Sequence, residues 1–237
     1  MIKSNIVLLV NCWYSSRMSK KTAPPAHEVV YQKLRRQILF GELIPGQAVT
    51  IQGLTDSLDA GMTPVREALR RLISEGALAF QGNRRVSVPI LTADNINELI
   101  FARQAIEPEL IVLATQRATP SDLDHLEAID TVLDNTIRSG DVNGYLQKNY
   151  EFHHALYDLA NAPILVSLAD SMWLRFGPSL RVVCGRMGTQ NLPDQHKVCL
   201  AAMRSGDAEK AAAAIRDDVI QGMEQVKFNL MEDRKSA

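Results

Sequence analysis

The chain has 237 residues, 46% of them hydrophobic, and a formal net charge of −1. A chain of this length can bury a substantial core and is expected to hold two domains. Its cysteines, Cys12, Cys184 and Cys199, are odd in number and show no C-x-x-C spacing. This argues against a disulfide framework and against a cysteine zinc site, so a reducing cytoplasm is the expected compartment.

Charge is distributed unevenly along the chain. Residues 1–89 carry 12 Lys/Arg and 6 Asp/Glu, a net charge of +6, whereas residues 90–237 carry 14 and 21, a net charge of −7. A basic first part and an acidic second part are expected of a two-domain protein in which only the first approaches a polyanion. The alternative is that the excess reflects a tail, because residues 1–27 contribute +4 of the positive charge.

Residues 1–27 are expected to form a disordered segment or an upstream extension. The apolar run at 6–10 is far too short to span a bilayer, and no convincing small-residue cleavage site follows it. The sequence therefore predicts neither a signal peptide nor a membrane partner.

Residues 28–89 are expected to form a small domain of three helices followed by a hairpin. An amphipathic helix is predicted over about 28–40, and a second short helix follows Thr50, a good N-cap. A glycine-containing turn then leads to a third helix. Two short strands, at 77–80 and 86–88, form the hairpin. Helices joined by a tight turn and followed by a hairpin make a winged helix-turn-helix.

The third helix of this domain carries the clearest signals in the chain. Thr63 is the expected N-cap, Pro64 suits the first helical position, and Gly76 suits the left-handed residue that closes the helix. Arg66 and Arg70, four residues apart, share one face of it. Such a helix either reads DNA, with its N-terminal end in the major groove, or is a surface helix with solvated arginines. The apolar residues that recur at helical spacing are Val65, Ala68, Leu69 and Leu72.

Residues 90–237 are expected to form an all-helical bundle, which makes the fold class mainly α. Proline, glycine and N-cap signals mark the helix boundaries. Because the loops are short, neighbouring helices should run antiparallel. The helices are predicted over about 93–117, 120–138, 142–160, 163–187, 194–205 and 208–230.

Four polar residues fall on inward, otherwise apolar faces of the predicted bundle. Asn149 and His153 lie four apart on one helix, while His196 and Asp218 lie on two later helices. His154 faces another side and is expected to be peripheral. Buried polar groups need partners, so the four residues could converge on a divalent cation. The alternative is that they are hydrogen-bonded core residues without a metal.

A specific pattern between residues 34 and 88 consists of Ile38, Gly41, Pro45, Gly46, Leu54, Leu58, Thr63–Leu69, Leu72, Glu75 and Gly76. This pattern resembles the winged helix-turn-helix of the GntR family of bacterial transcription regulators. The helical second half is similar to the FCD domain of the FadR subfamily, in its shorter, VanR-like version, and the whole resemblance covers about residues 28–228. It implies a DNA-binding transcription regulator whose operator affinity is controlled by a small carboxylate effector in the helical domain. A homodimer is expected, because one recognition helix covers only a half-site.

The resemblance assigns DNA contact to the third helix and to the hairpin. Arg66 is expected to read a base edge, because arginine can donate two hydrogen bonds to guanine. Thr63 is expected to help hold a phosphate at the helix start. The family usually has arginine where this chain has Met62 and glycine where it has Arg85, so the operator preference should differ from that of relatives. The expected DNA-binding residues are Thr63, Arg66, Arg70, Arg84 and Arg85.

The resemblance also bears on the polar residues of the bundle. Many FCD domains place one aspartate and three histidines around a metal ion that helps to hold a carboxylate effector. Matching motif to motif implies that the ligands here are Asn149, His153, His196 and Asp218. Two nitrogen and two oxygen ligands are compatible with zinc, nickel or manganese and do not select among them.

Arg103 lies in a run that resembles the opening Arg-x-x-x-Glu pattern of the family. A cation facing the cavity could pair with an effector carboxylate, which makes Arg103 the expected effector-binding residue. The alternative is an intrahelical ion pair with Glu107, which the four-residue spacing permits.

The competing function is a helical metalloenzyme that uses the His/Asp residues to activate water. The sequence offers no evident general base beside them, such as the glutamate of a His-Glu-x-x-His helix. A metalloenzyme would also leave the winged helix unexplained, so the sequence predicts a regulator and not an enzyme.

Overall fold

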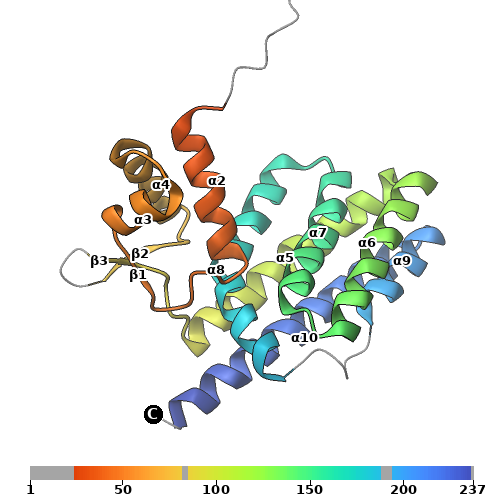
Figure 1. Ribbon diagram of the computed structural model, residues 1–237. Coiled ribbons are helices and arrows are strands. Elements are labelled where there is room, and N and C mark those ends of the chain that lie inside the picture. The colour runs from red at the N-terminus through yellow and green to blue at the C-terminus, as the bar shows by residue number, and fades with distance from the viewer. Residues whose placement is uncertain (1–23, 82–84, 188–193, 236–237) are drawn as a thin grey trace, which may run out of the picture.

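The computed structural model describes residues 24–81, 85–187 and 194–235. These residues fold into a small N-terminal lobe and an elongated lobe of long helices (Figure 1). The small lobe holds all strands of the described residues. The mainly α fold class predicted from the sequence is confirmed.

The N-terminal lobe is a winged helix-turn-helix. Its helices are α2 (Ala26–Leu39), α3 (Ile51–Leu58) and α4 (Met62–Ser74). Thr50 caps α3 as predicted, because its side chain accepts a hydrogen bond from the backbone N–H of Gly53. Apolar side chains of α2 and α4 pack together and hold α4 in place. Those with 0% exposure are Leu34, Ile38, Val65 and Leu72.

Helix α4 begins earlier than the sequence predicts. Its N-cap is Gly61 and its first residue is Met62, so the prediction of Thr63 as the N-cap is wrong. Pro64 stands within the first turn, where a missing N–H costs no intrahelical hydrogen bond, so the helix start can shift by a residue or two. The other end is as predicted, because Gly76 adopts a φ of +74° just after the helix.

A three-stranded antiparallel sheet, in the order β1-β3-β2, forms the wing. Its strands are β1 (Ala48–Val49), β2 (Ala79–Gln81) and β3 (Arg85–Ser87). The predicted hairpin is confirmed, whereas β1 was missed because two residues are too few to show an alternating pattern. Arg85 pairs with Gln81 in the ladder, so β3 begins one residue before the strand predicted over 86–88.

Among the described residues, the second lobe contains helices and no strands. Every boundary lies within one residue of its prediction, except that α10 runs on to Lys235. Helix α10 packs along α5 and α9, and α6 packs along α7. Among the described residues, no helix is both long and apolar enough to cross a bilayer. The helices are α5 (Ala93–Arg117), α6 (Pro120–Ser139), α7 (Val142–Leu159), α8 (Pro163–Met187), α9 (Gln195–Arg204) and α10 (Ala208–Lys235).

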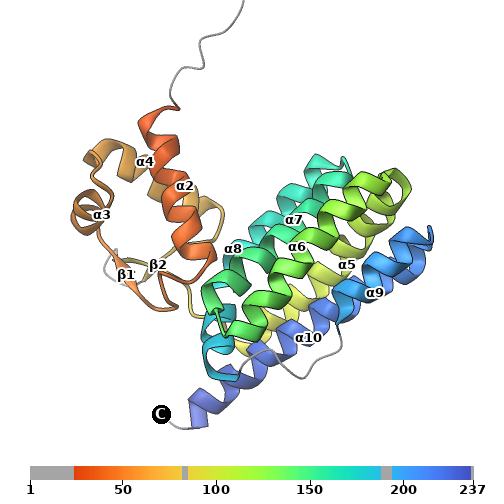
Figure 2. The ribbon, with the colours of Figure 1, turned by 45° about the vertical axis from the view of Figure 1, so that its right-hand side comes forward.

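Helix α2 joins the two lobes by packing against α8 (Figure 2). At this contact Arg35 Nη2 lies 2.9 Å from Asp170 Oδ1 and 3.2 Å from the Tyr150 hydroxyl oxygen. Asp170 also accepts a hydrogen bond from Tyr150, and it lies 2.6 Å from His154 Nε2. We refer to these four residues as the Arg35 network. His154 thus belongs to the domain contact and lies outside the predicted metal site.

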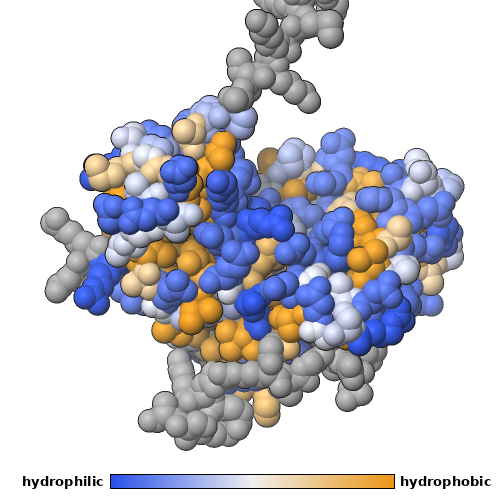
Figure 3. Space-filling view, in the orientation of Figure 1, coloured by the Kyte–Doolittle hydropathy of each residue, from blue (hydrophilic) through white to orange (hydrophobic). Residues whose placement is uncertain are grey.

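Close packing at the end of α2 depends on a glycine. A Cβ added at Gly177 of α8 would overlap the carbonyl oxygen of Leu39, the last residue of α2. Arg181, one turn further along α8, donates hydrogen bonds to the carbonyl oxygen of Phe40 and to Asn143. On the face shown in Figure 3, hydrophilic side chains cover much of the boundary between the lobes. Polar contacts therefore surround a tight backbone contact between the domains.

Candidate functional site

Helix α4 presents two arginines to solvent. Arg66 and Arg70 are exposed, and neither has a hydrogen bond or an ion pair with the described residues. Helix α3, the other helix of the motif, lies on the side of the lobe away from the bundle in both ribbon views (Figures 1 and 2). The two guanidinium groups can therefore bind an external partner without breaking an internal contact. The buried stripe predicted for α4 is confirmed at Val65, Ala68, Leu69 and Leu72.

The neighbouring Arg71 is also exposed, but its guanidinium is bonded to other residues of the domain. Its Nη1 lies 3.0 Å from Glu28 Oε2, and its Nε lies 3.0 Å from Glu75 Oε1. Its guanidinium carbon lies 3.5 Å from the ring centre of Tyr31. Burial, and a hydrogen bond that the hydroxyl donates to Glu75, raise the pKa of Tyr31 to about 12. Arg71 therefore fastens α4 to α2, and Arg66 and Arg70 do not share that role.

Of the other predicted DNA-binding residues, two are described by the structure and one is not. Thr63 is exposed in the first turn of α4, and Arg85 is exposed at the first residue of β3. Arg84 belongs to the stretch 82–84, which lies outside the described residues. DNA contact by these residues stays a prediction.

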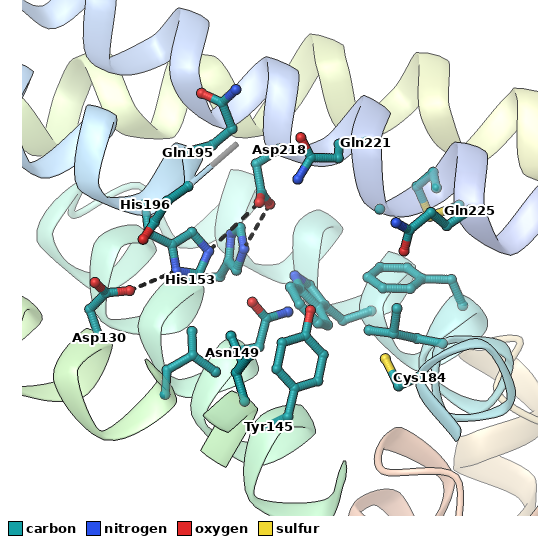
Figure 4. A pocket seen from close by; sticks show the side chains of 18 of the residues that line it. Asp130, Tyr145, Asn149, His153, Cys184, Gln195, His196, Asp218, Gln221 and Gln225 are labelled. Atoms are coloured by element: carbon teal, nitrogen blue, oxygen red, sulfur yellow. Dashed lines mark hydrogen bonds and ion pairs between the residues drawn. The ribbon is translucent and has the colours of Figure 1, made fainter. Parts of the chain in front are cut away.

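A cavity of about 160 Å³ opens inside the bundle. Side chains from α5, α6, α7, α8, α9 and α10 line it. Figure 4 shows His153, His196 and Asp218 gathered at one end. Tyr145 and Gln225 line the cavity farther from these three residues. We refer to the two histidines and the aspartate as the His/Asp cluster.

Asp218 faces both histidines of the cluster. Its Oδ2 lies 3.2 Å from His153 Nε2, and its Oδ1 lies 3.8 Å from His196 Nε2. One ligand atom from each of the three residues lies within 4.8 Å of the other two. Asn149, 8% exposed, lines the same cavity one turn before His153. The structure therefore brings the four residues predicted as metal ligands into one cavity.

The residues of the cluster shift one another's ionisation. Burial lowers the pKa of His153 by more than the Asp218 carboxylate raises it. Burial also opposes protonation of His196, but its hydrogen bond to Asp130 and the charge of Asp218 outweigh burial and raise its pKa. Burial opposes ionisation of Asp218, yet the contact with His153 and the charge of His196 lower its pKa to about 2. Neutral His153 and ionised Asp218 are the forms that bind metal ions.

Asp130 on α6 is a site residue that the sequence predictions missed. It is 4% exposed, and its Oδ1 lies 3.1 Å from His196 Nδ1. Phe152 stacks on the same imidazole, with ring centres 4.0 Å apart and planes at 13°. These contacts fix the His196 ring. A signal was present, because Asp130 interrupts an apolar stripe made by Leu123, Leu126 and Leu133.

Arg103 is buried at the wall of the cavity and paired with Glu107. It is 3% exposed, and its Nε and Nη2 lie 2.5 Å and 3.1 Å from the two carboxylate oxygens of Glu107. The ring centres of Trp173 and Phe176 lie 5.1 Å and 4.2 Å from its guanidinium carbon. The intrahelical pair that was the alternative role of Arg103 is therefore present. Contact between Arg103 and an effector stays a prediction.

Two family models match the chain. Residues 26–88 match bacterial regulatory proteins of the gntR family, and residues 98–220 match the FCD domain. The chain belongs to the GntR family. It is a DNA-binding transcription regulator with a C-terminal FCD domain, as the resemblance implied. Membership of a family of regulators favours this function over the competing metalloenzyme.

Relatives agree with this assignment over most of their length. The HTH-type transcriptional regulator McbR of Escherichia coli is 30% identical over 183 residues, which cover 76% of this chain and 83% of McbR. The solved structure of E. coli McbR/YncC superimposes with a TM-score of 0.81 at 26% identity, covering 88% of this chain and all of that one. A GntR regulator from Rhodococcus sp. RHA1 shares the fold, with a TM-score of 0.70 at 24% identity. FCD domains often bind metal ions, and the His/Asp cluster offers groups that could hold one.

Proposed function

We propose that this GntR regulator binds its operator as a cytoplasmic homodimer, and that a small carboxylate effector in the FCD pocket changes its operator affinity. In this proposal residues 28–89 bind DNA, while residues 90–237 bind the effector and dimerise. The observation that carries the DNA-binding part is the pair of exposed guanidinium groups of Arg66 and Arg70. Neither has a partner among the described residues.

The positions on α4 and the wing support different roles for the proposed DNA contacts. Arg66 lies near the N-terminal end of α4, the end that enters the major groove, so it is assigned a bidentate contact with a guanine edge. Thr63 and the unpaired backbone N–H groups of the first turn hold a phosphate. Arg70, Arg84 and Arg85 contact the DNA backbone, which positions the protein without reading sequence.

The donors around the His/Asp cluster fit a divalent metal ion. His153 Nε2 is buried and has no hydrogen bond with the described residues, although Asp218 Oδ2 is 3.2 Å away. A cation between the two groups would satisfy both. The proposed ligands are Asn149, His153, His196 and Asp218, for zinc, nickel or manganese. When bound, the ion supplies positive charge that holds the effector carboxylate, and Arg103 at the cavity wall is its second proposed contact.

An electrophoretic mobility shift with DNA upstream of the protein's own gene tests the DNA-binding part. We expect salt-sensitive binding by the wild type and loss of specific binding by Arg66→Ala, because this side chain reads the base edge. Arg138→Ala removes an exposed arginine of α6 in the bundle and is the matched control, which should bind like the wild type. Unchanged binding by Arg66→Ala contradicts the proposal.

A further inference from the structure

The cavity of the bundle has a second end, away from the His/Asp cluster. Tyr145 on α7 and Gln225 on α10 line this end (Figure 4). We propose that these two residues bind an uncharged hydrogen-bonding group, a hydroxyl or a carbonyl, which the effector carries opposite its carboxylate. This inference rests on the proposed function and narrows its effector to a short, elongated monocarboxylate.

Two helices place polar side chains along the cavity. Tyr145, Asn149 and His153 follow one another at intervals of four residues, so they share one face of α7. Asp218 and Gln225 are seven residues apart, which is about two turns of α10. His153 and Asp218 lie 3.2 Å apart at one end, while Tyr145 and Gln225 lie toward the other. Because eight residues of helix rise about 12 Å, the row on α7 is much longer than a carboxylate group.

The polar groups of the second end have no internal partner. The hydroxyl group of Tyr145, which points into the cavity in Figure 4, has no hydrogen bond with the described residues. The same holds for the side-chain amide of Gln225. Burial raises the pKa of Tyr145 well above its ordinary value, so the hydroxyl keeps its proton. A hydroxyl and an amide can both donate and accept, so together they suit a hydroxyl or a carbonyl of a ligand.

Gly222 leaves room for the effector between the two ends. It lies within α10, between Asp218 and Gln225, and lines the cavity. A Cβ added there would meet no atom within 4 Å beyond its immediate neighbours in the helix. Glycine destabilises the interior of a helix relative to alanine, and here close packing gives no reason for it. The missing side chain instead keeps the middle of the cavity open.

The charges along the cavity favour an effector with one carboxylate. Among the described residues that line the cavity, Arg103 is the single arginine or lysine, and it is bonded to Glu107. The proposed metal ion supplies its positive charge at the other end. A second carboxylate beside Tyr145 and Gln225 would therefore be buried without a cation of its own, which is very costly.

The volume of the cavity favours a small effector. It measures about 160 Å³. An engineered protein cavity of about 150 Å³ holds one benzene molecule. A straight-chain acid of four to six carbons with a terminal hydroxyl is therefore a suitable probe.

Three sets of straight-chain acids with four to six carbons test the inference on the full-length protein with Zn²⁺ bound. The sets are the alkanoates, the alkanoates with a terminal hydroxyl, and the dicarboxylates of equal length. At the length that binds best, we expect the hydroxy acid to bind about tenfold more tightly than the alkanoate, because the alkanoate leaves buried polar groups unpaired. The dicarboxylate should bind more weakly than the hydroxy acid. Isothermal titration calorimetry measures the dissociation constants.

Tyr145→Phe removes the hydroxyl and keeps the ring. It should lose the preference for the hydroxy acid, yet bind the alkanoate and Zn²⁺ like the wild type. Its thermal midpoint should not fall, because the hydroxyl has no internal partner. Tyr150→Phe removes a hydroxyl of the Arg35 network from the same helix and is the matched control, which should keep the preference. An unchanged preference in Tyr145→Phe overturns the role of Tyr145.

Gly222→Leu tests where the body of the effector lies. The added side chain fills the middle of the cavity, so binding of all three sets should be lost while Zn²⁺ binding stays. Gly222→Ala adds a single carbon to the helix and should raise the thermal midpoint, which confirms that the position tolerates a side chain. A Gly222→Leu variant that binds the hydroxy acid like the wild type contradicts the proposed placement.

Failure of this inference and failure of the proposed function give different results. If alkanoates or dicarboxylates bind as tightly as the hydroxy acids at every length, the inference is overturned and the carboxylate-binding metal site remains. The inference also fails if a protein that binds Zn²⁺ binds none of the three sets. A wild type that binds neither Zn²⁺ nor any of these acids contradicts the proposed effector site, and this inference with it.

Discussion

Arg66 and Arg103 are the same residue type in opposite surroundings. Arg66 on α4 is exposed and has no hydrogen bond or ion pair with the described residues. Arg103 on α5 is 3% exposed, is bonded twice to Glu107, and lies against the rings of Trp173 and Phe176. The guanidinium of Arg66 is therefore free to bind another molecule, whereas that of Arg103 is already bonded to Glu107.

The difference shows why a surface arginine and a buried one carry different information. An arginine in water contributes little to the stability of the fold, so its position is not dictated by the interior. A buried arginine must be paired, because an isolated charge in the interior is very costly. Arg103 is therefore explained first by its neighbours, whereas Arg66 is free to make the DNA contact proposed for it.

The largest effect should come from breaking the buried pair. Arg103→Met leaves Glu107 buried without its partner and should lower the free energy of unfolding by about 3–5 kcal/mol. Arg66→Ala should change it by no more than about 0.5 kcal/mol. Denaturant unfolding measures both. The double variant Arg103→Met/Glu107→Leu is the control and should regain much of the loss. A small loss in Arg103→Met alone would remove the distinction between the two arginines.

Metal binding should stabilise the helical bundle, which holds Arg103, and not the winged-helix lobe, which holds Arg66. Zn²⁺ at a concentration 100 times its dissociation constant should raise the free energy of unfolding by about 2.7 kcal/mol, and a chelator should reverse this. Asp218→Ala should lose the effect, because it removes a proposed ligand. Asp217→Ala removes the exposed neighbouring aspartate and should keep it. Equal stabilisation of wild type and Asp218→Ala, measured by thermal unfolding, would place the ion elsewhere.

The smallest effect is expected from adding an arginine to the exposed set. Met62 is the first residue of α4 and is 53% exposed, at the position where the family usually has arginine. Met62→Arg should tighten operator binding by about 1 kcal/mol and steepen its salt dependence by about one charge. Met62→Gln, of similar length but uncharged, should do neither. Mobility shifts at several salt concentrations provide the measurement.

Much of the fold could be predicted from local signals. Thr92, Thr119, Gly140 and the prolines mark helix ends through caps and turns that depend on a few adjacent residues. Such signals fixed the bundle helices to within one residue, apart from the end of α10. The start of α4 was placed wrongly because Gly61 and Thr63 are both acceptable N-caps. Strand β1 was missed because it exists only through pairing with β3.

The sequence revealed only those site residues whose polar side chains interrupt an apolar face of a helix. His153 and His196 stand out in this way, but Tyr157 and Trp173 look like ordinary core residues in the sequence. Their hydrogen bonds join Trp173 on α8 to Tyr157 and His153 on α7, so they depend on how two helices meet. The Arg35 network is a similar case, because its members lie on both lobes. No local pattern reports such contacts.

Gly177 limits which DNA-binding domains this bundle could carry. The carbonyl oxygen of Leu39 occupies the space that any larger residue at this position would need. A chimaera that joins a foreign winged-helix domain to this bundle therefore keeps the native angle between the domains only under one condition. The helix that replaces α2 must approach Gly177 of α8 as closely as α2 does. Exchanging the bundle for that of a relative with alanine at this position would push the end of α2 away from α8 and change the angle between the domains. The absence of a side chain at one position thus sets how interchangeable these two modules are.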